Sequence, residues 1–212
     1  MALFDRIKQE REKLKGLSPK EKAGYFVEYY KWHVIIIVAL AVWVGITIHQ
    51  AVTTPDVYLC GVLFNSSDLL AEEEIQGIVD GFSQEEGLDS GKETLLLHTN
   101  LTYFEREGFA SSNYESMEIL STWILAGEVD FIIADANLMN RLAEGKYLLE
   151  LPASFDNRKK VSDYLLDVSS SQLLGSIYGD LSETLTLGIA VSSQNTDRIL
   201  ALIDYLEIES EG

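Results

Sequence analysis

The sequence predicts an α/β fold: one transmembrane helix followed by a three-layer α/β domain with a mostly parallel sheet. Two observations lead to this prediction. Residues 32–55 contain no Asp, Glu, Lys or Arg. Beyond them, short apolar runs typical of strands alternate with amphipathic stretches typical of helices. We expect a basic cytoplasmic segment with an amphipathic helix over residues 1–31, a transmembrane helix over 32–54 and an extracytoplasmic α/β domain over 55–212.

The apolar segment is long enough to cross a bilayer once, because about 20 helical residues span the hydrocarbon core of about 30 Å. Ser18, Pro19 and Glu21 form a helix start, with Ser as the N-cap and Pro at the first helical position. Tyr, Phe and Trp side chains crowd the N-terminal border, as is usual at the headgroup level. A cleaved signal peptide is the alternative. The long preceding segment and the poor cleavage site at 51–53 favour a signal anchor.

The charge distribution predicts the orientation. Residues 1–31 hold eight Lys and Arg against five Asp and Glu, and the remainder holds eight against 29, a net charge of −21. Basic residues stay on the cytoplasmic side, and the first one after the apolar segment is Lys92. We therefore expect a single-pass cell-membrane protein with its N-terminus in the cytoplasm and its C-terminal domain extracellular. The acidic domain repels phosphate backbones, so no nucleic-acid partner is expected.

The elements of the domain follow from apolar runs and capping residues. An N-terminal helix on the inner leaflet, or else a solvated tail, is expected before residue 18. The expected strands cover residues 56–64, 94–99, 129–134, 164–168 and 185–191. The expected helices run from the capping residues 65–68 to Gly87, over 113–126, from the Asp135 cap to Gly145, and over 195–206.

Two segments resemble extracellular solute-binding proteins of the type 2 periplasmic class. Residues 124–135, followed by 142–145 and 148–151, resemble the stretch in which a helix ends, a short strand runs to the ligand cleft and the next helix follows. Residues 187–195, leading into 203–206, resemble the returning strand and its packing helix. The match covers about a third of the chain. The whole chain also resembles membrane-anchored proteins of unassigned function from Gram-positive bacteria.

The resemblance implies only one lobe, because the 33 residues between Leu151 and Leu185 are too few for a second. A single lobe lacks the opposing wall of a closed ligand cleft. The alternatives are weak affinity, a cleft completed by another subunit, or a fold reused as an interaction module.

Catalytic groups are scarce in the outer domain. His98 is its only histidine and lies in an apolar run, and Cys60 is the only cysteine of the chain. We expect Cys60 in the core, no enzyme activity, no cofactor and no metal site. Residues 175–179 are not a Gly-x-Ser-x-Gly elbow, and the acidic runs lack the spacing of a calcium loop. A weaker alternative is an enzyme that uses Asp130 and Asp135 as a carboxylate pair.

Polar residues directly follow the expected strands. In a doubly wound sheet such loops converge on the edge where ligands bind, although the same residue types also cap helices. The candidate ligand-binding residues are Asn65, Ser66, Asp68, Thr99, Asn100, Thr102, Tyr103, Asp135, Asn137, Ser192, Ser193 and Asn195.

The function expected from these observations is a membrane protein that displays a non-enzymatic, solute-binding-like domain outside the cell. Its partners would be the lipid bilayer and either a small-molecule ligand or a partner protein. The alternative is a structural or accessory subunit that docks on a membrane transporter or another membrane complex.

Overall fold

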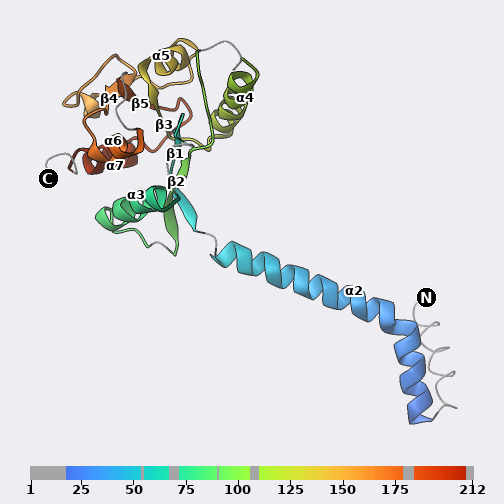
Figure 1. Ribbon diagram of the computed structural model, residues 1–212. Coiled ribbons are helices and arrows are strands. Elements are labelled where there is room, and N and C mark those ends of the chain that lie inside the picture. The colour runs from blue at the N-terminus through green and yellow to red at the C-terminus, as the bar shows by residue number, and fades with distance from the viewer. Residues whose placement is uncertain are drawn as a thin grey trace. The chain divides into compact units, whose positions relative to one another are not determined.

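The computed structural model describes residues 18–53, 55–66, 72–89, 91–105, 110–178 and 184–208. The chain divides between Thr54 and Pro55 into two compact units. Among the described residues, the first unit contains one long helix and the second contains the α/β domain (Figure 1).

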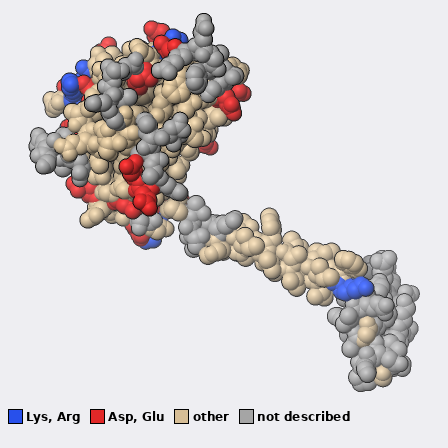
Figure 2. All heavy atoms as spheres, viewed as in Figure 1, with Lys and Arg blue, Asp and Glu red and all other residues tan. Residues whose placement is uncertain are grey.

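Helix α2, Pro19–Thr53, begins directly after Ser18, as the Ser-Pro pair predicts. Its part from Lys31 to His49 is apolar, exposed and long enough to cross a membrane, properties that a membrane anchor and a signal sequence share. Figure 2 shows most of this helix without acidic or basic side chains. The Thr47 hydroxyl donates to the Trp43 carbonyl oxygen at 2.9 Å, so its polar group is satisfied within the helix.

The domain is built on five strands. In chain order they are β1 (Asp56–Leu63), β2 (Glu93–His98), β3 (Phe131–Asp135), β4 (Leu165–Asp167) and β5 (Leu185–Ile189). The order in the sheet is β2-β1-β3-β5-β4. Strand β1 is parallel to β2 and β3, whereas β5 is antiparallel to both β3 and β4. Four strands thus share one direction, and the prediction of a mostly parallel sheet in an α/β domain is confirmed.

Helices cover both faces of the sheet, and each face has its own core (Figure 1). Helices α3 (Glu72–Glu85), α6 (Gln172–Tyr178) and α7 (Thr196–Ile208) pack on one face with the 3-10 turn η1 (Ala153–Phe155). Helices α4 (Ala110–Ala126) and α5 (Ala136–Glu144) pack on the other. Odd-numbered residues of β1 such as Leu59 and Leu63 face the first core, and Cys60 and Val62 face the second.

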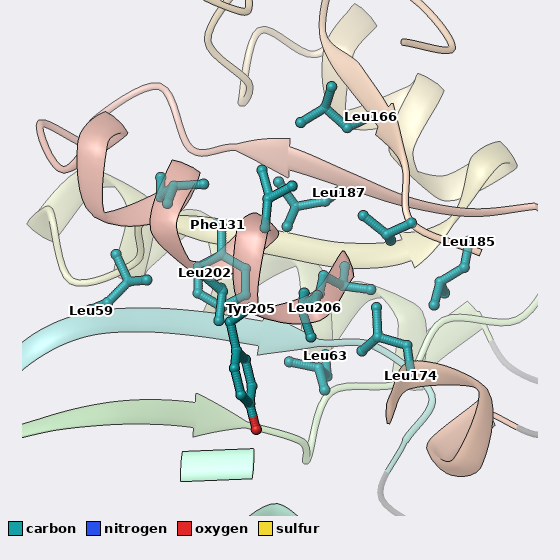
Figure 3. Close-up of a cluster of buried hydrophobic side chains, with 14 of the residues drawn as sticks. Leu59, Leu63, Phe131, Leu166, Leu174, Leu185, Leu187, Leu202, Tyr205 and Leu206 are labelled. Carbon is teal, nitrogen blue, oxygen red and sulfur yellow. The ribbon is translucent and has the colours of Figure 1, made fainter. Parts of the chain in front are cut away.

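The core beneath α7 is closely interdigitated. Figure 3 shows Leu202 and Leu206 of α7 directed toward Phe131 and Leu63 of the sheet. A Cβ atom at Gly61 would lie 2.1 Å from the Phe131 ring, so only glycine admits this ring against β1.

The last helix contacts the first strand at a bulge near the start of β1. The register with β2 skips Tyr58, which packs on the same core as Leu59. The Arg198 guanidinium lies 4.2 Å from the centre of the Tyr58 ring, and its Nη1 donates to the Tyr58 carbonyl oxygen at 2.6 Å. This cation–π contact joins α7 to β1.

Three differences separate the predicted elements from the observed ones. Helix α6 was not predicted, because its seven residues are too few to show a periodic pattern. Strand β4 has only three residues, and β3 begins at Phe131. The backbone of Asp130 nevertheless bonds Cys60 and Ala190 just before the named strand. Residues 67–71, at the predicted start of α3, lie outside the described part of the chain.

Candidate ligand-binding edge of the sheet

The C-terminal ends of β1, β2 and β3 lie at one edge of the sheet because the three strands are parallel. We call this the carboxyl edge. Asn65, directly after β1, adopts φ 59°, a left-handed conformation that Asn tolerates well. Its side-chain amide donates to the Tyr103 carbonyl oxygen at 3.0 Å, and its Oδ1 accepts from the Tyr103 N–H at 2.8 Å. The loops after β1 and β2 are therefore fixed to each other.

Asp135 ends β3 and caps α5, as the sequence predicts. Its Oδ1 accepts from the N–H groups of Asn137 and Leu138, both at 3.0 Å. The carboxylate stabilises the helix start both through these bonds and through the helix dipole. Its second oxygen, Oδ2, accepts no hydrogen bond from the described residues.

Tyr178, the last residue of α6, lies near Ser66, which follows β1. Its side chain is only 7% exposed, yet its hydroxyl has no hydrogen-bond partner among the described residues. Burial raises the pKa of Tyr178; the Ser66 hydroxyl lowers it, and the Asp135 carboxylate raises it further. The two hydroxyls are therefore close, but their geometry is not that of a hydrogen bond. Ser66 is fully buried and donates instead to the Leu63 carbonyl oxygen at 2.9 Å.

An unpartnered buried hydroxyl costs about 1–3 kcal/mol, so the position of Tyr178 calls for an acceptor. Sequence reasoning missed Tyr178 because it considered residues 175–179 only as a nucleophile motif. Ser171, whose hydroxyl accepts from the Leu174 N–H at 3.4 Å, is the capping signal that could have indicated α6.

The remaining candidates at the carboxyl edge have structural partners or face solvent. The Thr102 N–H donates to the Ser116 hydroxyl at 3.3 Å. Thr99 is half-buried and Asn100 is exposed. Asn137 lines an open polar depression along α5 together with Glu105, Asn140, Arg141 and Glu144. Asp68 lies outside the described residues.

The last three candidates lie at the opposite edge, contrary to the expected convergence. Ser192, Ser193 and Asn195 follow β5, and β5 runs antiparallel to β3. The Ser193 hydroxyl donates to Asp130 Oδ1 at 2.7 Å, and the Asn195 amide donates to the same oxygen at 2.9 Å. Asp130 Oδ2 accepts from the Cys60 N–H at 2.9 Å. These residues hold the loop after β5 onto the start of β3.

Asp130 and Asp135 do not form a carboxylate pair. They lie at opposite ends of β3, and five residues of strand span about 16 Å. The described residues contain no group of three or more His, Cys, Asp or Glu side chains placed to hold a metal ion.

No known protein family, curated protein or solved structure matches this chain. Its functional assignment therefore rests on its own residues.

The two reactive residue types of the domain are engaged in packing: Cys60 is buried and His98 is half-buried. Burial, followed by Asp130 and Glu128, raises the pKa of Cys60 to about 12. The His98 ring stacks on Trp123 with centroids 4.2 Å apart, and burial lowers its pKa against the opposing effect of Glu128. Neither side chain is poised as a nucleophile or base.

Basic side chains of the domain are almost all engaged. Of the seven described Lys and Arg residues from 55 onward, six bind acidic groups or a carbonyl oxygen. They are Lys92 with Asp89, Arg141 with Glu105, Arg158 with Asp204 and Glu207, Lys159 with Asp167, Lys160 with Asp156, and Arg198 with Tyr58. The seventh, Lys146, follows the end of α5 that is remote from Asp135. Figure 2 shows mainly acidic charge on the visible face of the domain.

Proposed function

We propose that this chain is a single-pass membrane protein that displays a non-enzymatic α/β domain outside the cell, and that the domain binds a small polar ligand at its carboxyl edge. The buried, unpartnered hydroxyl of Tyr178 beside Ser66 and Asp135 carries the proposal. Open α/β sheets bind ligands at the C-terminal ends of their strands, and a buried donor without a partner is a group that a ligand can satisfy.

The resemblance to one lobe of a solute-binding protein agrees with this proposal. It implies a returning strand followed by a packing helix, and β5 followed by α7 occupies those positions in the sequence. Strand β5 enters the sheet between β3 and β4 in the reversed direction. A single lobe leaves the carboxyl edge open on one side, which suits a ligand that binds weakly or a cleft completed by another subunit.

Ligand binding can be measured through Cys60. It is the only cysteine, it is 2% exposed and it lies in the domain core, so a thiol-reactive fluorogenic dye reports when the domain of the full chain in detergent unfolds. A ligand that binds the folded state raises the melting temperature with its concentration. We expect a shift with small polar ligands that is reduced in Tyr178→Phe, which removes only the hydroxyl. Melting temperatures that no sugar, amino acid, amine or peptide changes would contradict the proposal.

The proposed orientation has its own test. Cysteines introduced at Ser18 and at Leu125, which is 87% exposed, lie on either side of the apolar helix, and native Cys60 is too buried to react. A membrane-impermeant thiol reagent added to intact cells should label Leu125→Cys and leave Ser18→Cys unlabelled. The reverse pattern would contradict the orientation. Loss of an N-terminal tag from the mature protein would identify a cleaved signal sequence instead.

A docking role is the second candidate, and the edge strand β2 favours it. Strand β2 pairs only with β1 among the described residues, and its central Leu96 is 38% exposed. An open edge with an apolar centre can accept a strand from a partner protein. Leu96→Lys should weaken copurification of a membrane partner if this is the function, without affecting ligand-induced shifts.

A further inference from the structure

The two outer strands of the sheet are protected unequally. Strand β4 is short, and residues 159–161 cover its outer side. There the Val161 N–H donates to the Leu165 carbonyl oxygen at 2.8 Å, and the Asp167 N–H donates to the Lys159 carbonyl oxygen at 2.8 Å. Strand β2, on the other side of the sheet, has six residues and pairs only with β1 among the described residues.

Strand β2 keeps unused hydrogen-bonding groups on its outer side. An outer strand directs alternate N–H and C=O groups away from its neighbour. From Thr94 to His98, the backbone makes no hydrogen bond to the described residues outside the ladder with β1, except that the Leu95 carbonyl oxygen accepts from the Thr94 hydroxyl at 3.3 Å. The strand contains neither Lys nor Pro, residues that commonly prevent pairing at such a position.

Leu96, at the centre of β2, is part of a partly exposed apolar surface beside α4. Its register partner is Cys60, which faces the core on the α4 side, so Leu96 faces that side as well. Two residues further on, the His98 ring stacks on Trp123 of α4, and both rings are half-buried. A strand added to β2 would cover the exposed part of Leu96.

Carboxylates flank this surface at both ends of β2. Glu93 begins the strand, and its register partner on β1 is Asp56. Glu128 lies at the other end, because its N–H donates to the Trp123 carbonyl oxygen at 2.9 Å and the Trp123 ring stacks on His98. None of the three carboxylates forms an ion pair with the described residues.

These charges decide what kind of partner fits. Lys92, the basic residue directly before β2, is bound to Asp89 at 2.7 Å. If two copies paired antiparallel through β2, Glu93 of each would lie near Glu128 of the other, so like charges would meet. The net charge of −21 after residue 31 also opposes self-association. The same charges attract a basic partner.

We propose that β2 accepts an extended basic segment of a partner protein as a sixth strand of the sheet. An apolar side chain at the centre of that segment covers Leu96, and Lys or Arg side chains near its two ends contact Glu93 and Glu128. The main chain supplies affinity and the side chains supply specificity. This inference rests on the docking role proposed for β2 and adds the conformation and charge of the partner segment.

Four synthetic peptides of equal length test conformation and charge separately. The first has Val at its centre and Lys near both ends, and in the second and third Gln and Glu replace Lys. The fourth is the Lys peptide with N-methyl groups on its central residues, which block strand pairing but keep the charge. Binding to the full chain in a neutral detergent is measured by fluorescence anisotropy, with empty micelles as the blank. Hydrogen–deuterium exchange shows whether residues 93–98 become protected.

We expect the Lys peptide to bind about tenfold more tightly than the Gln peptide at low ionic strength, with slower exchange over residues 93–98. The Glu peptide and the N-methylated peptide should not bind. Added salt should reduce the difference between the Lys and Gln peptides, because the carboxylates lie near the surface.

Variants locate the contacts. The double variant Glu93→Gln with Glu128→Gln should lower the affinity for the Lys peptide to that for the Gln peptide. Glu150→Gln with Asp163→Asn removes two charges from exposed positions away from β2 and should leave the preference unchanged. Leu96→Lys should abolish binding of both peptides, because it places a charge at the centre of the added strand.

The outcomes distinguish the docking role from the charge class. Equal affinity for the Lys, Gln and Glu peptides with protection of β2, or a Lys preference that persists without Glu93 and Glu128, would overturn the basic class and leave docking intact. Binding of the N-methylated peptide, or binding without protection of residues 93–98, would overturn strand addition. No binding of any peptide would count against both and leave the ligand-binding proposal untouched.

Discussion

The side-chain amide of Asn195 donates to Oδ1 of Asp130 at 2.9 Å and so fixes the start of α7 to the start of β3. The same carboxylate accepts from Ser193 and from the backbone of Cys60. Three donors from two separate segments, the loop after β5 and strand β1, thus converge on one side chain that is 8% exposed. Such convergence identifies Asp130 as a structural residue that holds together the edge of the sheet opposite the carboxyl edge.

Asp130→Ala should destabilise the domain strongly. The change leaves three donors without their acceptor, and we expect a loss of about 3–5 kcal/mol in the free energy of unfolding. Urea denaturation followed through Cys60 reactivity measures it. Asp163→Ala, at an exposed position, is the matched control and should change stability by less than about 0.5 kcal/mol. Equal denaturation midpoints for the two variants would contradict this role.

Gly61→Ala and Gly188→Ala should destabilise the domain to different extents, although both glycines lie in central strands. The added Cβ at Gly61 meets the Phe131 ring at 2.1 Å, and that ring is fixed in the core. At Gly188 it meets the Met139 Cε at 2.7 Å and the Leu148 Cδ1 at 2.9 Å, the ends of flexible side chains. We expect the free energy of unfolding to fall by about 3 kcal/mol in Gly61→Ala and by less than about 1.5 kcal/mol in Gly188→Ala.

A second substitution tests whether the Phe131 ring causes the loss of stability in Gly61→Ala. Phe131→Leu removes ring atoms from the contact, so it should recover part of the stability that Gly61→Ala loses. The double-mutant cycle measures this coupling. Strictly additive effects would show that the Gly61–Phe131 contact is not the reason for the loss.

His98 should titrate below its ordinary pKa of 6.5, because burial against Trp123 disfavours the imidazolium. The unfolded chain then binds the proton more readily than the folded chain. Stability should therefore fall as the pH drops through 6.5 and level off below the folded-state pKa. In the variant with Trp32→Phe and Trp43→Phe, Trp123 is the only tryptophan, and its fluorescence should report the titration.

His98→Gln is the control for this titration. It should remove the fluorescence transition, since the stacked ring that takes up the proton is gone. A transition that persists in His98→Gln, or a midpoint above 6.5 in the parent, would contradict the assignment.

Cys60 should be nearly inert in the folded chain. A pKa of about 12 and 2% exposure leave almost no accessible thiolate at neutral pH. Its reaction with a disulfide reagent should be slower by at least about 100-fold than that of a cysteine placed at exposed Leu125. Rapid labelling of Cys60 under native conditions would show that β1 opens locally.

The elements that could be predicted are those whose signals are local. The apolar run 56–64 fixes β1, and an Asp at the end of a strand followed by an amphipathic stretch identifies the Asp135 cap. The direction of β5 could not be predicted in the same way. All five of its residues are buried, and an all-buried strand has the same pattern in either direction. The incorrect prediction that Ser192, Ser193 and Asn195 lie at the carboxyl edge follows from that ambiguity.

Tyr178 shows a different limit of sequence reasoning. It is buried in the core beneath α7 by residues distant in sequence, and it ends a helix too short to be periodic. Nothing within a window around residue 178 specifies those neighbours. The hydroxyl without a partner becomes visible only when the sheet and α6 are assembled.

The contact between Arg198 and Tyr58 spans 140 residues and joins the last helix to the first strand. Leu202 and Leu206 of the same helix complete the core over β1. During synthesis, β1 therefore leaves the ribosome long before α7, the helix that covers it. The apolar face of β1 stays uncovered until almost the whole domain has been synthesised. A nascent chain stopped before Thr196 has no means of closing this core. The unfinished domain must therefore be kept from aggregating until its final helix has been synthesised.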